Sequence, residues 1–298
     1  MLLSVAHTTR YGFSQGVSHG LQRLRLRPKS THGQRVIDWS VGYLGAKPEA
    51  EYVDQNDNRT VLVSIDPGVE EVVITCRGEV ETVDNNGVTG SHSGLMPLWC
   101  FLRPTALTRP GPAIRDLVSD TALDRANPLD MLHHLSQAVG ERIAYTKGAS
   151  DAATTAEEAL VRGEGVCQDH AHVLIAAGRL LDIPMRYVGG YLRMEGQDEQ
   201  EAGHGWAEAH VPGLGWVGFD VSNAICPDER YIRVATGCDY AEAAPVTGLA
   251  VGAGDTSLSV HLSVGEKMLG SQAQQQSGSD SGQSQSQSAS SGQQVQGG

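Results

Sequence analysis

The stretch that decides the fold runs from Gly163 to Leu181 and reads Gly-Glu-Gly-Val-Cys-Gln-Asp-His-Ala-His-Val-Leu-Ile-Ala-Ala-Gly-Arg-Leu-Leu. Glycines precede an apolar pattern with helical spacing, which predicts an amphipathic helix that begins near Cys167 and is stopped by Pro184. The first turn of a helix has unpaired N–H groups and a partial positive charge, and both favour a thiolate and can hold an oxyanion. Taken alone, this position is equally compatible with a buried, inert cysteine.

A second stretch supplies partners for such a thiolate. Residues 204–223 read His-Gly-Trp-Ala-Glu-Ala-His-Val-Pro-Gly-Leu-Gly-Trp-Val-Gly-Phe-Asp-Val-Ser-Asn and predict two strands joined by a turn. If His210 pairs with Trp216, then His204 lies diagonally across from Asp220, and a shift by two residues makes them direct neighbours. His210 lies farther away, at about 3.4 Å per residue along the strand, so Asp220 can orient His204 but not His210. A nucleophile, a base and an orienting group are what nucleophilic catalysis requires.

The remaining sequence divides into regions of different pattern. Residues 1–85 hold short alternating segments separated by Gly, Pro, Asn and Asp, which predicts an all-β, sandwich-like domain. A connector over 86–112 leads to helical segments and then a run of strands, which predicts an α+β core over 113–270. Residues 271–298 are mostly Gln, Ser and Gly and predict a disordered tail. The predicted elements are strands at 1–13, 21–27, 34–43, 59–65, 71–77, 185–193, 204–211, 216–221, 231–236 and 257–264, with helices at 113–120, 127–139, 152–161 and from Cys167 to Leu181.

Composition and charge argue against several classes of protein. The chain of 298 residues has 22 Lys and Arg against 35 Asp and Glu, a formal net charge of −13, which argues against a nucleic-acid binder. No stretch approaches ~20 continuous apolar residues, so we expect no membrane span. The apolar run at the N-terminus stops at Ala6 without a basic leader or a cleavage site, which predicts a cytoplasmic protein with five mostly reduced cysteines.

These motifs together resemble a known family. Cys167 in GEGVCQDHAH, His204 in GHGWAEAHVPGLGWVGFD and Asp220 at the end of that run resemble the Cys–His–Asp core of bacterial transglutaminase-like proteins. The resemblance covers about residues 3–265. It implies an N-terminal β domain followed by a papain-like core in which the cysteine-bearing helix packs on an antiparallel sheet or barrel. Gly205, where the family usually has Ala, and His170, where it often has an aromatic residue, depart from the pattern.

The resemblance also implies a chemistry. It implies cysteine-dependent hydrolysis or acyl transfer on the amide bonds of a protein or peptide substrate, through a Cys167–His204–Asp220 triad and a thioester, with no cofactor. Gln168, Trp206 and Tyr191 are candidates for the cleft and the oxyanion site. Peptidases, amidases and transglutaminases share such a triad, so the choice between water and an amine as acceptor stays open, as does the oligomeric state.

Two other interpretations compete with this one. Cys167, Asp169, His170 and His172 are close in sequence, with Cys226 and Cys238 available, and could form a metal site. However, neither a CxxC pair nor HExxH occurs, and His172 lies on a different helix face from Cys167. The other alternative is a catalytically inactive module that keeps the fold and binds proteins.

Overall fold

The first part of the chain consists of long strands that bury every second side chain. In β1 (Leu2–Phe13), Leu3, Val5, His7 and Thr9 are buried and their neighbours are more exposed, which is the two-residue period of a strand that covers a core on one side. The other strands of this region are β2 (His19–Arg27), β3 (Gln34–Leu44), β4 (Ala46–Val53), β5 (Arg59–Ile65), β6 (Glu71–Thr82), β11 (Glu199–Gln200), β15 (Val246–Val251) and β16 (Thr256–Glu266).

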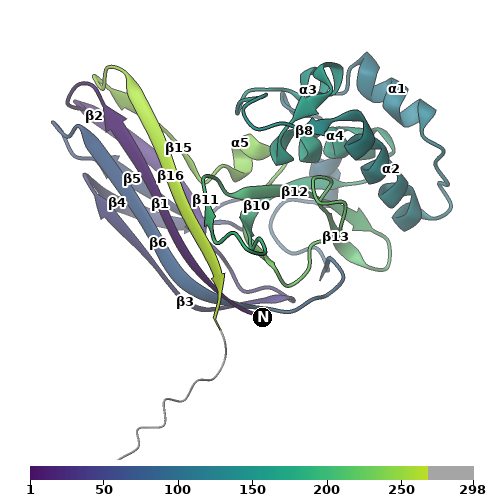
Figure 1. Cartoon of the computed structure of the whole chain (residues 1–298), viewed down its shortest axis with the longest axis horizontal. Coiled ribbons are helices and arrows are strands. Elements are labelled where there is room, and N and C mark those ends of the chain that lie inside the picture. The colour runs from purple at the N-terminus through teal and green to yellow at the C-terminus, as the bar shows by residue number, and fades with distance from the viewer. Residues whose placement is uncertain (268–298) are drawn as a thin grey trace, which may run out of the picture. The chain divides into compact units, whose positions relative to one another are not determined.

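These strands form two sheets in the computed structural model, which describes residues 1–267 (Figure 1). The orders are β11-β16-β1-β6-β3 and β15-β2-β5-β4, and an apolar cluster that includes Leu24, Val63 and Ile74 is buried among their strands. The predicted β strands of this region are therefore confirmed. The sequence did not indicate β4, because seven of its eight residues are exposed and show no alternation of apolar and polar residues. The predicted tail over 271–298 lies outside the described residues.

Two strands from the far end of the chain complete these sheets. β16 pairs with β1, with Val264 opposite Val5, and β15 pairs with β2, with Val246 opposite Leu24. Figure 1 shows the purple first strand beside the yellow last one. The sequence prediction places residues 246–266 with the core instead. Alternation identifies a strand at 257–264 but does not identify the strand with which it pairs.

The middle of the chain forms a helical layer on a further antiparallel sheet, separate from the two sheets described above. The helices are η1 (Leu98–Leu102), α1 (Pro112–Asp120), α2 (Pro128–Arg142), α3 (Ala156–Arg162), α4 (Cys167–Leu180) and α5 (Tyr240–Ala243), and the strands are β7 (Val88–Gly90), β8 (Ala144–Tyr145), β9 (Glu164–Gly165), β10 (Met185–Leu192), β12 (His204–Val211), β13 (Gly215–Phe219) and β14 (Tyr231–Gly237). The sheet order is β14-β10-β12-β13-β7. This arrangement confirms the predicted α+β class.

Helix α4 lies at the centre of this core. Every residue from Asp169 to Arg179 is buried, because β12 and the helices α1, α2 and α3 pack around it. The sequence predicts an amphipathic helix with a single apolar face, and the structure shows burial on all sides. No helix within residues 1–267 is long and apolar enough to cross a membrane.

The sandwich and the core share a buried boundary. Tyr191, Ile232 and Val234 of the core pack with residues of β1, β6 and β16 in one apolar cluster. Beside it, the Asn58 side chain donates a hydrogen bond to the Thr236 carbonyl (2.7 Å) and accepts one from the Thr236 N–H (2.8 Å). An amide side chain that mimics a strand partner fixes β14 against the loop before β5. The boundary matters because it determines the shape of the cavity described below.

Candidate active site

Cys167 is the first residue of α4, and a buried carboxylate fixes that helix start. The Asp169 side chain accepts a hydrogen bond from the Val166 N–H (2.7 Å) and another from the Ser150 hydroxyl. Val166 is extended and acts as the helix cap. The Asp169 and His170 N–H groups donate to the Val166 carbonyl at 3.0 and 3.1 Å. Within residues 1–267 the N–H groups of Cys167 and Gln168 make no backbone hydrogen bond, so the first turn presents the Cys167 thiol together with these two free donors.

His204 and Asp220 meet at the end of the β12–β13 hairpin. The His204 Nε2 donates to the Asp220 Oδ2 at 2.6 Å. Of the two registers considered from the sequence, the hairpin has the one with His210 opposite Trp216 and Glu208 opposite Gly218. His210 lies beside the turn and packs against Trp216, with ring centroids 5.4 Å apart. The structure therefore selects His204 as the partner of Asp220, as the spacing predicted.

Asp220 remains ionised although it is almost completely buried. Its Oδ2 also accepts hydrogen bonds from the Tyr231 hydroxyl and the Asn223 amide, both at 2.7 Å. Burial alone would raise the pKa of Asp220, but its hydrogen bonds to His204, Asn223 and Tyr231 and the charge of His204 hold that pKa below the usual value. The sequence analysis missed Tyr231 and Asn223. Asn223 lies only three residues from Asp220, whereas nothing in the sequence points to Tyr231.

The imidazole of His204 links Asp220 to Cys167. Burial would lower the pKa of His204, but hydrogen bonds to Asp220 and Cys167, together with the charges of both partners, raise it to about 10. Because Nε2 is bonded to Asp220, Nδ1 is the ring nitrogen left for Cys167. The structure thus brings the three predicted residues together in one chain of contacts, with His204 protonated at neutral pH.

Cys167 and His204 open onto a cavity of about 320 Å³. Its walls come from both regions of the chain: β1, β2, β15 and β16 of the sandwich, and α4, β10, β14 and α5 of the core. The lining includes His7, Thr9, Tyr11, Arg25, Leu26, Gln168, Tyr187, Tyr191, Gly205, Val234, Tyr240, Val246, Leu258 and Val260. A reacting group at Cys167 would therefore lie in a pocket that neither region forms alone.

The remaining predicted site residues differ in their positions. Gln168 lines the cavity, but its amide donates to the Asp151 carbonyl at 3.5 Å. Tyr191 also lines the cavity, and its hydroxyl is bonded to the His7 Nδ1 at 2.9 Å. Trp206 is not part of the lining. Because it shares a strand face with His204, it lies behind that residue, with the two rings stacked at 6.2 Å.

The histidines near Cys167 are used in packing and hydrogen bonding. His170 bonds the Ser222 hydroxyl (2.8 Å) and the Ile143 carbonyl (3.0 Å), and His172 accepts from the Tyr240 N–H (3.1 Å). Burial lowers the pKa of His170, and it lowers that of His172 to about 3. Within residues 1–267, no group of three or more His, Cys, Asp or Glu side chains is arranged to hold a metal ion.

Three of the other cysteines have conditions that disfavour a thiolate. Burial raises the pKa of Cys76 and of Cys238 to about 12 each, and it also raises that of Cys226. These thiols remain protonated at neutral pH. Cys167 differs from them because it has a protonated imidazole as its neighbour.

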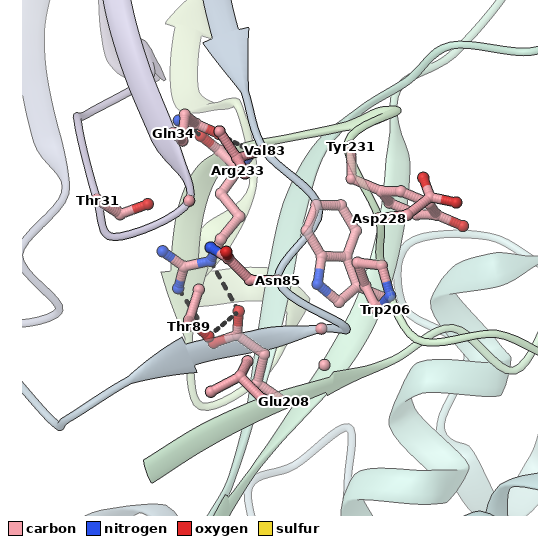
Figure 2. A pocket seen from close by; sticks show the side chains of 15 residues that line it. Thr31, Gln34, Val83, Asn85, Thr89, Trp206, Glu208, Asp228, Tyr231 and Arg233 are labelled. Carbon is pink, nitrogen blue, oxygen red and sulfur yellow. Dashed lines mark hydrogen bonds and ion pairs between the residues drawn. The ribbon is translucent and has the colours of Figure 1, made fainter. Parts of the chain in front are cut away.

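A second, small cavity of about 50 Å³ lies beside Trp206 and Glu208 (Figure 2). Figure 2 shows Arg233 and Thr89 directed at the Glu208 carboxylate. Arg186 pairs with the same carboxylate at 2.6 Å, so the single charge of Glu208 is shared by two largely buried guanidinium groups. Neither Cys167 nor His204 lines this cavity, and we interpret the ion cluster as part of the framework behind the hairpin.

Comparisons with known proteins agree with this geometry. Residues 3–81 match the model of the bacterial transglutaminase-like N-terminal region, and residues 115–221 match the model of the transglutaminase-like superfamily. An uncharacterized protein of Mycobacterium leprae is 27% identical over 87% of this chain and 96% of its own length. An uncharacterized protein of Mycobacterium tuberculosis is 27% identical over 82% of this chain and 86% of its own.

The fold has a counterpart among solved structures. A crystal structure from Cytophaga hutchinsonii, described as a "putative cysteine protease", superposes with a TM-score of 0.71 at 19% identity, over 91% of this chain and 92% of that one. The second family match spans the residues that carry Cys167, His204 and Asp220. Residues 3–81 are therefore similar to a bacterial transglutaminase-like N-terminal region, and residues 115–221 are similar to the core of the transglutaminase-like superfamily.

Proposed function

We propose that this chain is a cysteine-dependent hydrolase or acyltransferase that acts on amide bonds. The observation that supports this most is the hydrogen bond between His204 and Asp220 in a cavity that His204 lines together with Cys167, the first residue of helix α4. Cys167 is the proposed nucleophile and His204 the proposed acid and base. Asp220 is a positioning residue that holds the imidazole and its charge.

The proposed reaction begins with attack of the Cys167 sulfur on the carbonyl carbon of the substrate. The C–S bond forms, and the carbonyl π electrons move to the oxygen, where N–H groups of the helix start bind the resulting oxyanion. As the carbonyl re-forms, the C–N bond breaks and the leaving amine takes a proton from the His204 imidazolium. This leaves a thioester on Cys167 and a neutral imidazole.

The second half of the reaction uses that neutral imidazole as a base. Water or a primary amine attacks the thioester carbon while His204 accepts its proton. The C–S bond then breaks, which restores the thiolate and the imidazolium. Water gives a carboxylic acid and an amine gives a new amide, so the identity of the product distinguishes hydrolysis from acyl transfer.

The lining of the cavity suggests the class of acyl group. Apart from the Cys167–His204 pair, its one permanently charged side chain is Arg25, which is 3% exposed and paired with Asp54 at 3.0 Å. Burial lowers the pKa of His7 to about 4, so that ring is neutral at neutral pH. The rest of the lining is mostly tyrosine and aliphatic residues. We propose that the substrate is a peptide or protein segment with an uncharged aromatic or aliphatic residue on the acyl side.

Selective alkylation tests the thiolate pair directly. At about pH 6, iodoacetamide reacts with thiolates and hardly with neutral thiols, so peptide mapping should find Cys167 labelled first and Cys76 hardly at all. Replacement of His204 by Ala should remove this selectivity. Labelling of Cys167 at the rate of an ordinary exposed thiol would contradict the proposal.

Intact-mass measurement then tests the reaction. The protein is incubated with two matched peptide amides, one with Phe and one with Asp on the acyl side, with and without a primary amine. We expect a thioester adduct and turnover with the Phe peptide, and neither with the Cys167→Ala variant. Equal reaction of both peptides would contradict the proposed substrate class, and absence of any adduct would contradict the proposed activity.

A further inference from the structure

The Tyr187 ring packs directly against the backbone of Gly205, and a side chain at position 205 would have to displace that ring. Gly189 of β10 pairs with Gly205 of β12, and the Tyr187 ring reaches across to Gly205 from two residues earlier in β10. A Cβ on residue 205 would lie 2.7 Å from the Tyr187 Cζ and closer still to its hydroxyl oxygen. The family resemblance leads one to expect alanine at position 205. Because residue 205 is glycine, the Tyr187 phenol occupies the space that the alanine methyl group would fill.

The Tyr187 ring is held rigidly in the wall of the Cys167 cavity. It is 3% exposed, and it packs against the rings of His172 and Tyr240 at centroid distances of 5.4 and 5.9 Å. Within the described residues, its hydroxyl makes no hydrogen bond. The hydroxyl is not among the fully enclosed polar atoms, and Tyr187 lines the cavity, so this group is a donor that remains available to a molecule in the cavity.

The Tyr187 phenol has a raised pKa. Burial raises the pKa of Tyr187 well above its usual value, and the nearby Cys167 raises it further. The phenol therefore keeps its proton throughout the neutral range and acts as a hydrogen-bond donor. Tyr187 and Cys167 also line the same cavity.

We infer that the Tyr187 hydroxyl donates a hydrogen bond to the oxyanion that forms when Cys167 attacks a carbonyl group, beside the N–H donors of the helix start. The inference rests on the proposed function and adds a catalytic residue to it. Two of the other candidate donors are already engaged: the Gln168 amide bonds the Asp151 carbonyl, and the Tyr191 hydroxyl bonds His7. A donor that needs no reorganisation when charge develops contributes most to the rate.

An indole N–H could also donate a hydrogen bond to the oxyanion, but neither of the two tryptophans that precede Cys167, Trp39 and Trp99, is placed to do so. The Trp39 ring stacks on Tyr191 and its Nε1 donates to the Leu26 carbonyl at 3.0 Å. Trp99 is 58% exposed and does not line the cavity. Tyr240 also lines the cavity and its ring packs against Tyr187, so its removal would disturb the same wall. Tyr52 of β4 is 41% exposed and does not line the cavity, and it is therefore the matched control for removal of a hydroxyl.

Two reagents that attack the same sulfur test this role. Iodoacetamide reacts by displacement at a saturated carbon and forms no oxyanion, whereas p-nitrophenyl acetate acylates through a tetrahedral intermediate that does. Loss of one oxyanion donor costs about 10²-fold or more in rate. We therefore expect Tyr187→Phe to slow the p-nitrophenolate burst about 100-fold and to leave the alkylation rate within about twofold. Tyr52→Phe should leave both rates within about twofold.

Gly205→Ala provides an independent variant, because its methyl group displaces the Tyr187 ring without removing the hydroxyl. It should slow acylation in the wild-type background and have much less effect in the Tyr187→Phe background, since both changes remove the same contact. Equal slowing of both reagents by Tyr187→Phe, or no slowing of acylation, would overturn the inference alone. Failure of wild-type Cys167 to react with either reagent would overturn the proposed function, and the inference with it.

Discussion

Replacement of Asp220 by Asn removes the charge that holds His204 and changes little else in shape. The Asp220 Oδ2 accepts hydrogen bonds from His204, Tyr231 and Asn223, and its Oδ1 accepts one from the backbone N–H of Ser222. An asparagine would place an NH₂ group among these donors. The imidazolium would lose its buried counter-charge, so we expect the pKa of His204 to fall toward its ordinary value.

The expected effect on stability follows from the pKa of His204. The rise from 6.5 to about 10 corresponds to roughly 5 kcal/mol of preference of the folded state for the protonated ring. Since the folded-state pKa is raised, this stabilisation is fully present below about pH 6.5 and is lost as the pH rises through about 10. Asp220 and Cys167 share it, so Asp220→Asn should lower the free energy of unfolding by about 2–3 kcal/mol at pH 6, and by less as the pH approaches 10.

Urea denaturation at pH 6, 8 and 10, with an NMR titration of the His204 ring, measures both quantities. The matched control is Asp228→Asn, because Asp228 pairs with Arg230 and does not contact His204. The control should leave the His204 titration unchanged. If His204 titrates at the same pH in Asp220→Asn as in the wild type, or if the stability difference grows with pH, then Asp220 does not hold the imidazolium.

Other variants test the framework around the site. Asn58→Ala removes three side-chain hydrogen bonds at the boundary between sandwich and core, and urea denaturation should show a loss of about 3 kcal/mol. Glu208→Gln leaves two largely buried guanidinium groups without a counter-charge and should cost about 3–5 kcal/mol by the same measurement. His170→Phe should leave the pH profile of Cys167 alkylation unchanged, because His170 bonds Ser222 and the Ile143 carbonyl and does not line the cavity. Val260→Glu adds a charge to the cavity wall and should shift the preference among acyl donors toward a lysine-bearing peptide.

The sequence was sufficient to predict the geometry of the hairpin that bears His204. Strand alternation and one turn limit the pairing of β12 and β13 to two registers, both of which bring His204 near Asp220, and the structure has the one with His210 opposite Trp216. The position of Cys167 follows from helix start signals in the same way. Both predictions rest on interactions between residues close in sequence, where spacing determines geometry.

The contacts between distant segments could not be predicted in this way. Tyr231 reaches Asp220 from another strand, and Tyr187 reaches Gly205 across a strand pair whose register the sequence does not state. The pairing of β16 with β1 joins residues more than 240 positions apart. Alternation identifies such strands but gives no information on their neighbours. The cavity depends on these pairings and therefore could not be predicted from the sequence.

The strand order also has a consequence for the order of events during synthesis. The elements that carry Cys167, His204 and Asp220 are all complete by residue 220, whereas two walls of the cavity come from β15 and β16, which begin at Val246 and Thr256. A ribosome therefore makes Cys167, His204 and Asp220 before it makes these walls. The cavity that these residues line or adjoin can be complete only after the backbone has returned to the first strands of the chain.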